Sequence, residues 1–277
     1  MVANSSDFTQ KAEAALLAYR RADGRQTNVS DLPRLIETLR LIGGLDPLPR
    51  RVCDLATFGA IDPALRNLFG VPYIVTTGNA GAVPANELIF CDENGVEACR
   101  FVHDMFDLAG PFPYPDDAFD LVVFTEVLEH LARDPMHTMA EINRILRLDG
   151  RLILSTPNCV SARCVMNGLC GEHPYNWPPY SRESSTDRHN REYTPREVRA
   201  LISFSGFELV KFFCKDVYPK DSSTFAGLRR KAAAVFVSTI RGLLFGRDRA
   251  AGNGEMIFVV GRKVSGVTDR YPPFLYY

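Results

Sequence analysis

Apolar side chains recur at intervals of three and four residues in two segments near the start of the chain. Residues 8–22 carry this spacing and end at Asp23-Gly24, and a second run follows Ser30 or Asp31 and stops at Gly43-Gly44. This spacing places apolar side chains on one helix face, and such residues are typical of helix ends. We expect two amphipathic helices within residues 1–49, which cover one edge of a sheet or part of a substrate pocket.

From residue 51 short apolar runs alternate with helical stretches, a pattern typical of β-α-β units and a mostly parallel sheet. Asn94-Gly95 lies between the apolar runs 88–91 and 96–102 and predicts an antiparallel hairpin. Other strands are expected at 51–55, 71–76, 119–124, 151–155, 207–213 and 256–260, and helices at 61–69, near Glu126, at 134–148, 194–204 and 225–245. The long stretch 157–195, rich in Pro, Asn, Gly, Tyr and Arg, predicts a functional loop or lid.

Composition bounds the class of protein. The chain has 277 residues, 46% of them hydrophobic, which suits one α/β domain with insertions. The net charge of −1 argues against a general nucleic-acid binder. The first residues form no signal peptide and no apolar run spans a bilayer, so we expect a cytoplasmic protein, peripheral at most. Arg229-Arg230-Lys231 in the helix expected at 225–245 allows a membrane-surface helix, although a helix packed on the core is favoured.

The seven cysteines are odd in number, scattered, and mostly beside apolar residues, which predicts reduced core thiols. Cys159, Cys164 and Cys170 form a loose cluster along the chain. Their spacing fits no zinc pattern, so no metal site is expected.

Ligands of an open parallel sheet bind at the carboxyl ends of its strands. Four segments follow the expected strands there: 54–60, 76–79, 103–106 and 125–130. These segments are where we expect the chemistry.

Four stretches in register resemble the class I S-adenosylmethionine-dependent methyltransferases. They are HDMFDLAGPFPYPDDAFD (103–120), FDLVVFTEVLEHL (119–131), EINRILRLDGRLILSTPN (141–158) and REYTPREVRALISFSGFELV (191–210). The resemblance implies a Rossmann-like α/β fold, with a mostly parallel seven-stranded sheet whose last strand is inserted antiparallel, and S-adenosyl-L-methionine as cofactor. It divides the chain into N-terminal helices (1–49), a cofactor-binding half (50–158), a lid (159–195), the remaining half of the sheet (196–265) and a tail (266–277).

The same resemblance assigns cofactor contacts by position. It implies that the loop with Asp54, Ala56, Thr57 and Gly59 runs under the methionine moiety, that Asp104 and Met105 meet the adenine, and that Thr125 and Glu126 lie beside the sulfonium. The alternative is that Asp54 caps a turn and Asp104 is a solvated loop acid.

Two departures from the family pattern bear on this cofactor site. Only Gly59 remains of the family's three loop glycines, and Thr76-Thr77-Gly78-Asn79 stands where an acid usually holds the ribose, so that Thr77 or Asn79 would offer neutral hydrogen bonds. A left-handed turn costs a residue with a Cβ about 1–2 kcal/mol, a cost that Ala56 avoids if its φ stays negative, and we expect the Phe58 ring to turn away from the ligand into the sheet–helix interface. A non-catalytic binding or scaffold protein of the same fold is therefore a second hypothesis beside the enzyme.

Methyl transfer to a hydroxyl or amine needs a positioned base, and His189 and His130 are the candidates, with a structural role as the alternative for each. Arg188 and Arg191 could hold an anionic or sugar substrate. Tyr175, Trp177 and Tyr180 could stack on a sugar or ring, or form the lid's own small core. The segment HNREYT and the terminal PPFLYY look similar to methyltransferases of bacterial surface-polysaccharide synthesis, which implies a small-molecule or glycan acceptor.

Overall fold

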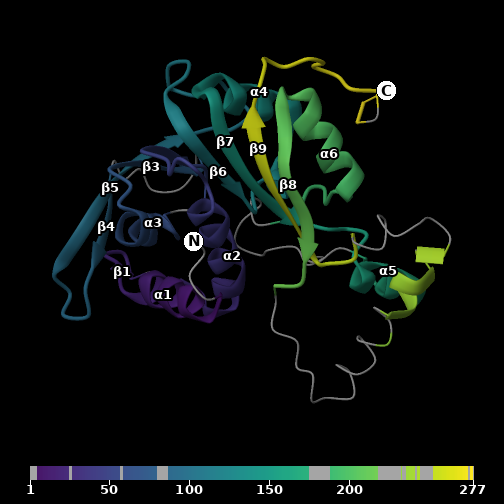
Figure 1. The fold of residues 1–277 in the computed structure, drawn as a ribbon, viewed down its shortest axis with the longest axis horizontal. Coiled ribbons are helices and arrows are strands. Elements are labelled where there is room, and N and C mark those ends of the chain that lie inside the picture. The colour runs from purple at the N-terminus through teal and green to yellow at the C-terminus, as the bar shows by residue number, and fades with distance from the viewer. Residues whose placement is uncertain are drawn as a thin grey trace.

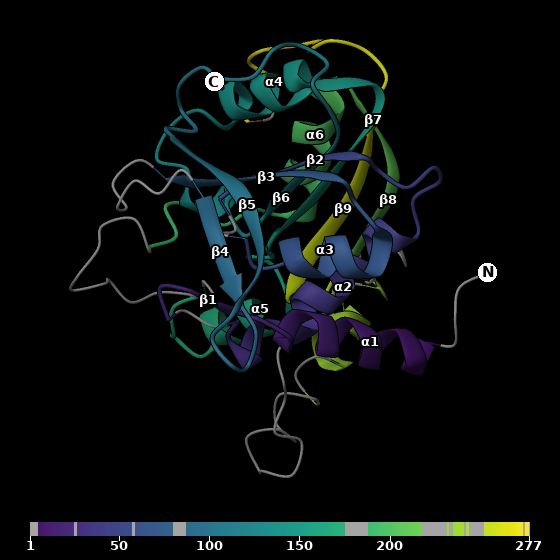
Figure 2. The same ribbon diagram turned by 90° about the vertical axis from the view of Figure 1, so that its left-hand side faces the viewer.

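The structure of the chain is a computed structural model. It describes residues 5–24, 27–56, 59–79, 87–174, 188–217, 232, 235–240, 242–243, 252–273 and 275–276. Within this part of the chain one large sheet carries helices against both of its faces (Figures 1 and 2).

The described part of the sheet has nine strands in the order β1-β4-β5-β3-β2-β6-β7-β9-β8. Their bounds are β1 (Arg20–Arg21), β2 (Arg51–Asp54), β3 (Tyr73–Asn79), β4 (Glu87–Cys91), β5 (Glu97–Phe106), β6 (Phe119–Thr125), β7 (Leu146–Pro157), β8 (Phe207–Lys215) and β9 (Met256–Lys263). The central neighbours β5, β3, β2, β6 and β7 run parallel, and β9 lies antiparallel between β7 and β8. The α/β class and the inserted antiparallel strand are confirmed, whereas the count of seven strands was too low because β1 and β4 extend one end.

The helices form a layer on each face of the sheet. They are α1 (Ser5–Leu17), α2 (Leu32–Gly43), α3 (Asp62–Phe69), α4 (Pro135–Ile145), α5 (Ala162–Leu169) and α6 (Pro195–Phe204), with 3-10 turns η1 (Val29–Asp31) and η2 (Leu128–His130). Along β6, Leu121 and Val123 join the core under α1–α3, and Val122 and Phe124 join the core under α4 and α6. Figure 2 shows these two layers below and above the sheet. A strand buried on both faces explains the continuous apolar run at 121–124.

Several local expectations are confirmed. The Asn94-Gly95 hairpin joins β4 and β5, and Gly95 has the positive φ of 78° that favours glycine. Thr194 and Glu197 form the two reciprocal hydrogen bonds of a capping box at the start of α6. The apolar stripe expected on the second helix is buried: Leu32, Leu35, Ile36, Leu39 and Ile42.

Other expectations were wrong. The helix expected to reach residue 22 ends at Leu17, because Arg20 and Arg21 pair with β4 as a short edge strand. The helix expected near Glu126 is only the turn η2, because Glu126 has a φ of +57° that interrupts the backbone first. The helix expected to reach Leu148 ends at Ile145, since Leu146 pairs with Phe119 in the sheet.

The thiols are only partly in the core. All seven cysteines are free, as expected. Cys53 and Cys164 are buried, Cys170 is exposed, and the remaining four are intermediate. A reduced state is thus compatible with the structure, but a uniform core position was wrong.

The chain's last segments complete the fold. Leu275 and Tyr276 of the tail pack on the core under α4 and α6, and the Tyr276 hydroxyl hydrogen-bonds Asp134 at the start of α4. Most of the helix expected at 225–245 lies outside the described residues, while 235–240 are helical. None of the helices that the structure describes has the length and apolarity to cross a bilayer.

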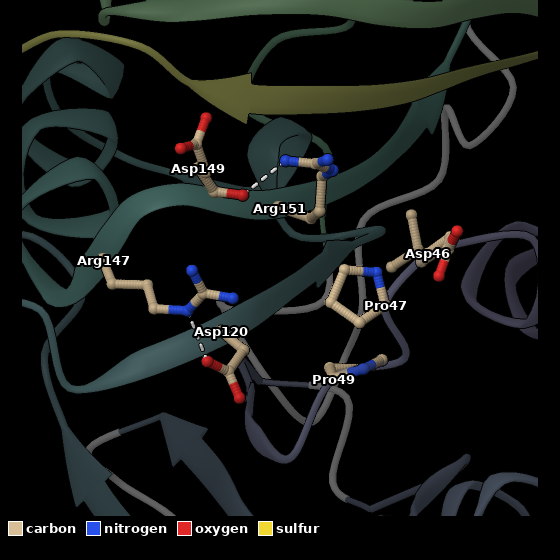
Figure 3. Close-up of a pocket in the computed structure, with 8 residues that line it drawn as sticks. Asp46, Pro47, Pro49, Asp120, Arg147, Asp149 and Arg151 are labelled. Atoms are coloured by element: carbon tan, nitrogen blue, oxygen red, sulfur yellow. Dashed lines mark hydrogen bonds and ion pairs between the residues drawn. The ribbon is translucent and has the colours of Figure 1, made fainter.

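A groove of about 280 Å³ lies at the amino ends of the central strands (Figure 3). Arg147 and Asp120 form an ion pair in it, with 2.6 Å between Nε and Oδ1. Because it lies at the edge opposite the carboxyl ends of the parallel strands, we do not assign it to the functional site.

Candidate active site

The four segments expected to carry chemistry meet at one edge of the sheet. Strand register places Thr77 beside Asp104 on β3 and β5, and Thr125 beside Ser155 on β6 and β7. Asp54 ends β2 between these two pairs. Parallel strands end at a common edge, so residues far apart along the chain share it.

The loop after β2 crosses this edge in a left-handed conformation. Ala56 has a φ of +58°, so it does not avoid the cost of a left-handed conformation, and its backbone N–H donates to Thr77 Oγ1 at 2.9 Å. The hydrogen bond holds a conformation that costs a residue with a Cβ about 1–2 kcal/mol. Thr57 and Phe58 lie outside the described residues, so the expected orientation of the Phe58 ring stays a prediction.

Gly59 is the one family glycine left in the loop, and its conformation requires it. Its φ is +75°, and a Cβ there would lie 2.9 Å from Leu88 Cδ1. The hairpin strand β4 therefore packs against the loop and leaves no room for a side chain.

A buried pair of carboxyls lies beneath the loop. Asp54 and Asp62 are both fully buried, and the Thr76 hydroxyl donates to Asp62 Oδ2. Burial is the largest cause that raises the pKa of Asp62, to about 6, although hydrogen bonds from Thr76 and Asp54 lower it. Whether Asp54 lies under the cofactor or only caps a turn stays a prediction.

The end of β5 presents Asp104 and Met105. Asp104 Oδ2 accepts a hydrogen bond of 2.7 Å from the Tyr114 hydroxyl, and the Tyr114 ring packs edge-on against Phe119. A Cβ on Gly78 would lie 2.4 Å from Met105 Sδ, so the missing side chain lets the methionine sulfur lie over β3. Asp104 is thereby an oriented, half-buried acid at the strand end rather than a solvated one.

On the other side of the edge, five side chains converge. We name Glu126, Glu129, His130, His189 and Glu192 the acid–imidazole cluster. The two imidazole rings meet edge-on, with 4.8 Å between ring centres, and Glu129 and Glu192 are 1% and 2% exposed. His130 and His189 come together as candidates for the base, although η2 rather than the expected helix positions His130.

Hydrogen bonds orient each member of the cluster. Ser155 Oγ donates to Glu126 Oε1 at 2.8 Å, and Thr156 Oγ1 donates to Glu129 Oε2 at 2.9 Å. His189 Nδ1 lies 2.7 Å from Glu192 Oε1. Such a contact places the proton on Nδ1, so that Nε2 is the basic nitrogen of His189.

Hydrogen bonds join the segment 188–191 to this cluster. The N–H groups of Asn190 and Arg191 donate to Glu129 O, at 2.8 and 3.2 Å. His130 Nδ1 lies 3.1 Å from Arg188 O, and Asn190 Nδ2 donates to His130 O. The segment 188–191 is thus hydrogen-bonded to η2. These bonds bring His189 beside His130, although the two residues are 59 positions apart in the sequence.

The cluster perturbs its own carboxyls. Burial is the largest cause that raises the pKa of Glu126 and of Glu129, and the charge of Glu126 raises the pKa of Glu129 further. The hydrogen bonds from Ser155 and Thr156 and the charge of Arg34 on α2 act in the opposite direction. Groups with perturbed pKa values gathered at one strand-end edge mark a candidate active site.

Of the predicted substrate residues, the structure describes Arg188 and Arg191. Arg188 Nε donates to Asn190 Oδ1 at 3.0 Å, and Arg191 Nη2 donates to Glu197 Oε1 at 2.5 Å, so the guanidinium groups bind neighbouring protein side chains. Tyr175, Trp177 and Tyr180 lie outside the described residues. A role for any of these side chains in substrate binding stays a prediction.

Reading of the sequence missed Glu129, Glu192 and the hydroxyls of Ser155 and Thr156. A signal for Glu129 was present, since it stands three residues after Glu126 and beside His130. Glu192 follows His189 by three residues in a stretch without regular secondary structure, where spacing alone does not place side chains together.

Comparison with known proteins agrees with this geometry. A family model described as a methyltransferase domain matches residues 32–211, which is more than half of the chain. No curated protein matches.

Solved structures with a similar arrangement include a SAM-dependent methyltransferase from Archaeoglobus fulgidus, at 16% identity over 83% of this chain and 91% of that one, with a TM-score of 0.49. A putative methyltransferase from Bacillus halodurans is similar at 17% identity over 83% and 98%, also with a TM-score of 0.49. At these values the likenesses add no argument beyond the family match.

The residues at the strand ends fit S-adenosylmethionine. The left-handed loop at Ala56 and Gly59 lets backbone pass close to a ligand, and Asp104 offers a held carboxylate at the end of β5. When bound, this cofactor supplies a methyl group on a sulfonium that is already activated. The family match and the fold of the strand-end edge together show that the chain belongs to the methyltransferase-domain family and is an S-adenosylmethionine-dependent methyltransferase.

Proposed function

We propose that the chain transfers the methyl group to a hydroxyl oxygen of a small-molecule or glycan acceptor, with the acceptor bound at the acid–imidazole cluster. The observation that carries this proposal is the 2.7 Å contact between His189 Nδ1 and Glu192 Oε1, with Glu192 buried. A carboxylate that holds Nδ1–H keeps Nε2 basic and stabilises the imidazolium after a proton is accepted.

The chemistry of a hydroxyl acceptor suits this arrangement. The hydroxyl gives its proton to the imidazole, and its oxygen forms the new C–O bond while the C–S bond breaks and leaves its electron pair on sulfur. A positioned base contributes a factor of about 10²–10⁴ to such a step. An acceptor atom that carries no proton needs no base, so the two oriented imidazoles favour an acceptor that must lose a proton, such as a hydroxyl.

The position of the cluster supports the same proposal. Glu126 follows Thr125 directly, at the point where the resemblance places the sulfonium, and its φ of +57° is rare for a residue with a Cβ. Its N–H donates to Ser155 O at 2.9 Å. Ser155 of β7 thus holds both the backbone of Glu126 and its carboxyl, to which the Ser155 hydroxyl donates.

A screen of acceptors tests the proposal. The purified protein is incubated with S-adenosylmethionine and panels of sugars, nucleotide-linked sugars, phenols and amines, and release of the demethylated cofactor is measured. Methylation confined to hydroxyl compounds, and lost in His189→Ala, is the expected result. Methylation of amines only, or full activity in His189→Ala, would contradict it.

The cytoplasmic location remains a prediction.

A further inference from the structure

Three side chains of the acid–imidazole cluster have the composition and spacing of a metal site. One ligand atom from each of Glu129, His130 and His189 lies within 4.8 Å of the other two. An ion with ligand bonds of about 2.1 Å needs such atoms about 3–4 Å apart, so a shift of about 1 Å closes the site. Two imidazoles and one carboxylate form the ligand set of several catalytic metal centres that keep positions open for other ligands.

An independent observation points to a ligand. Glu129 is 1% exposed, and its Oε1 has no hydrogen-bond partner among the residues that the structure describes. This oxygen faces the imidazoles, with 4.0 Å between Oε1 and His130 Nε2. Burying a carboxylate oxygen without a partner is costly, and a bound cation offsets that cost.

The second atom of each side chain is already held. Thr156 Oγ1 donates to Glu129 Oε2, His189 Nδ1 contacts Glu192 Oε1, and His130 Nδ1 contacts Arg188 O. Metal-bound imidazoles usually donate their other N–H to a carboxylate or a backbone carbonyl in this way. These contacts involve Nδ1 of both rings, and His130 Nε2 lies 4.0 Å from Glu129 Oε1.

We propose that Glu129 Oε1, His130 Nε2 and His189 Nε2 bind one divalent cation of the first transition series, such as Zn²⁺ or Mn²⁺. Two nitrogen ligands select these ions over Mg²⁺ and Ca²⁺, which prefer oxygen. The expectation that the chain holds no metal concerned its cysteines and did not consider this cluster.

A cation at this place changes one part of the proposed function, on which this inference rests: the acceptor and the transferred group stay the same, but His189 holds the ion instead of accepting the proton. Three protein ligands leave coordination positions for the acceptor, and a hydroxyl bound to a divalent ion loses its proton more readily. The proton then passes to solvent water rather than to His189, and the oxygen forms the C–O bond as before. An acceptor with a second oxygen beside the hydroxyl, such as a vicinal diol, fills two positions and is preferred.

The test is metal binding to tag-free protein that has been stripped with a chelator. Titration calorimetry with Zn²⁺, Mn²⁺ and Mg²⁺ measures the stoichiometry and affinity, and the visible absorption of added Co²⁺ reports the ligand set. We expect one site per chain, Mg²⁺ the weakest ion, and affinity reduced more than about 100-fold in Glu129→Gln and His189→Gln. Glu192→Gln should lose about tenfold, and His173→Gln, which lies outside the cluster, should bind as the natural chain does.

Two results would overturn the site: no binding by the natural chain, or equal binding by Glu129→Gln and His189→Gln. Should Glu129→Gln fail to fold, His189→Gln decides, because His189 lies outside helices and strands. Calorimetry with the demethylated cofactor runs in parallel. Methyl transfer to a hydroxyl without metal binding would support the proposed function and overturn the metal site. Metal binding without methyl transfer would support the metal site and overturn the proposed function.

Discussion

Around Ala56 the strand-end edge is shaped by backbone conformation, whereas around Glu129 it is shaped by side chains that hold one another. On the first side a left-handed turn rests on a single hydrogen bond to Thr77, and one glycine remains. On the second side three carboxyls, two imidazoles and two hydroxyls hold one another through hydrogen bonds and ring contacts. A ligand bound mainly through backbone tolerates changes of side chain, but proton or metal chemistry requires particular atoms at particular places.

The largest effect is expected on the side-chain half. His189→Ala removes the group that we propose to accept the proton or to bind the cation, so the methyl-transfer rate should fall by about 10²–10⁴. Affinity for the demethylated cofactor should stay within about twofold, since His189 lies in the other half. Turnover with an acceptor found in the screen, together with calorimetry, measures both. A loss of cofactor affinity as large as the loss of turnover would show that His189 also serves cofactor binding, and the two halves would then not differ in role.

A second effect concerns the buried acid beneath the loop. Because burial raises the pKa of Asp62 to about 6 in the folded state, the protonated form is favoured there, and stability falls as pH rises from about 4 to 6. Asp62→Asn removes this cost, which amounts to about 3 kcal/mol at pH 8 at most. Urea unfolding should show a gain at pH 8 that shrinks at pH 5 and vanishes near pH 4. A loss of stability at every pH would show that the hydrogen bonds of Asp62 outweigh its burial.

A third effect concerns cofactor affinity at Asp104, on the side of the site that contains Ala56. Asp104→Ala should weaken binding of the demethylated cofactor about 10–100-fold, because a hydrogen bond to a charged group contributes about 1.5–3 kcal/mol. Tyr114→Phe frees the Asp104 carboxylate and should change affinity less. Calorimetry measures both variants, with circular dichroism to confirm the fold. Unchanged affinity in Asp104→Ala would remove that residue from the site.

The smallest effect is expected at Ala56. Glycine adopts a φ near +58° without the cost of a Cβ, so Ala56→Gly should raise the free energy of unfolding by about 1 kcal/mol or less. Thermal unfolding measures the change, and calorimetry should show cofactor affinity equal or higher. A clear loss of stability would mean that the alanine methyl packs against the core more than its conformation costs.

The fold was largely predictable from the sequence, because strands buried on both faces, such as Val122 to Phe124, leave continuous apolar runs. The two extra strands were harder. Arg20 and Arg21 carry no strand pattern, and β1 exists only because β4 offers an edge to pair with. The sequence left the sign of φ at Ala56 open, since the left-handed turn depends on the Thr77 hydroxyl on another strand.

The candidate site was predictable only in part. His130, His189 and Glu126 were found because strand ends and the lid draw attention to them. Glu192 and the unpaired oxygen of Glu129 depend on how segment 188–191 lies on η2, which backbone hydrogen bonds between distant segments decide. Such contacts leave no periodic trace in the sequence.

The ends of the sheet have a consequence for solubility at high concentration. Strand β1 consists of two arginines, and Arg21 forms an ion pair with Asp23, with 2.6 Å between Nη2 and Oδ2. At the far end β8 carries Glu208 and Lys211, and its register with β9 shifts between Leu209 and Lys211. Short, charged or irregular border strands resist the addition of a strand from another molecule. A sheet this wide therefore gives neighbouring copies little template for edge-to-edge aggregation.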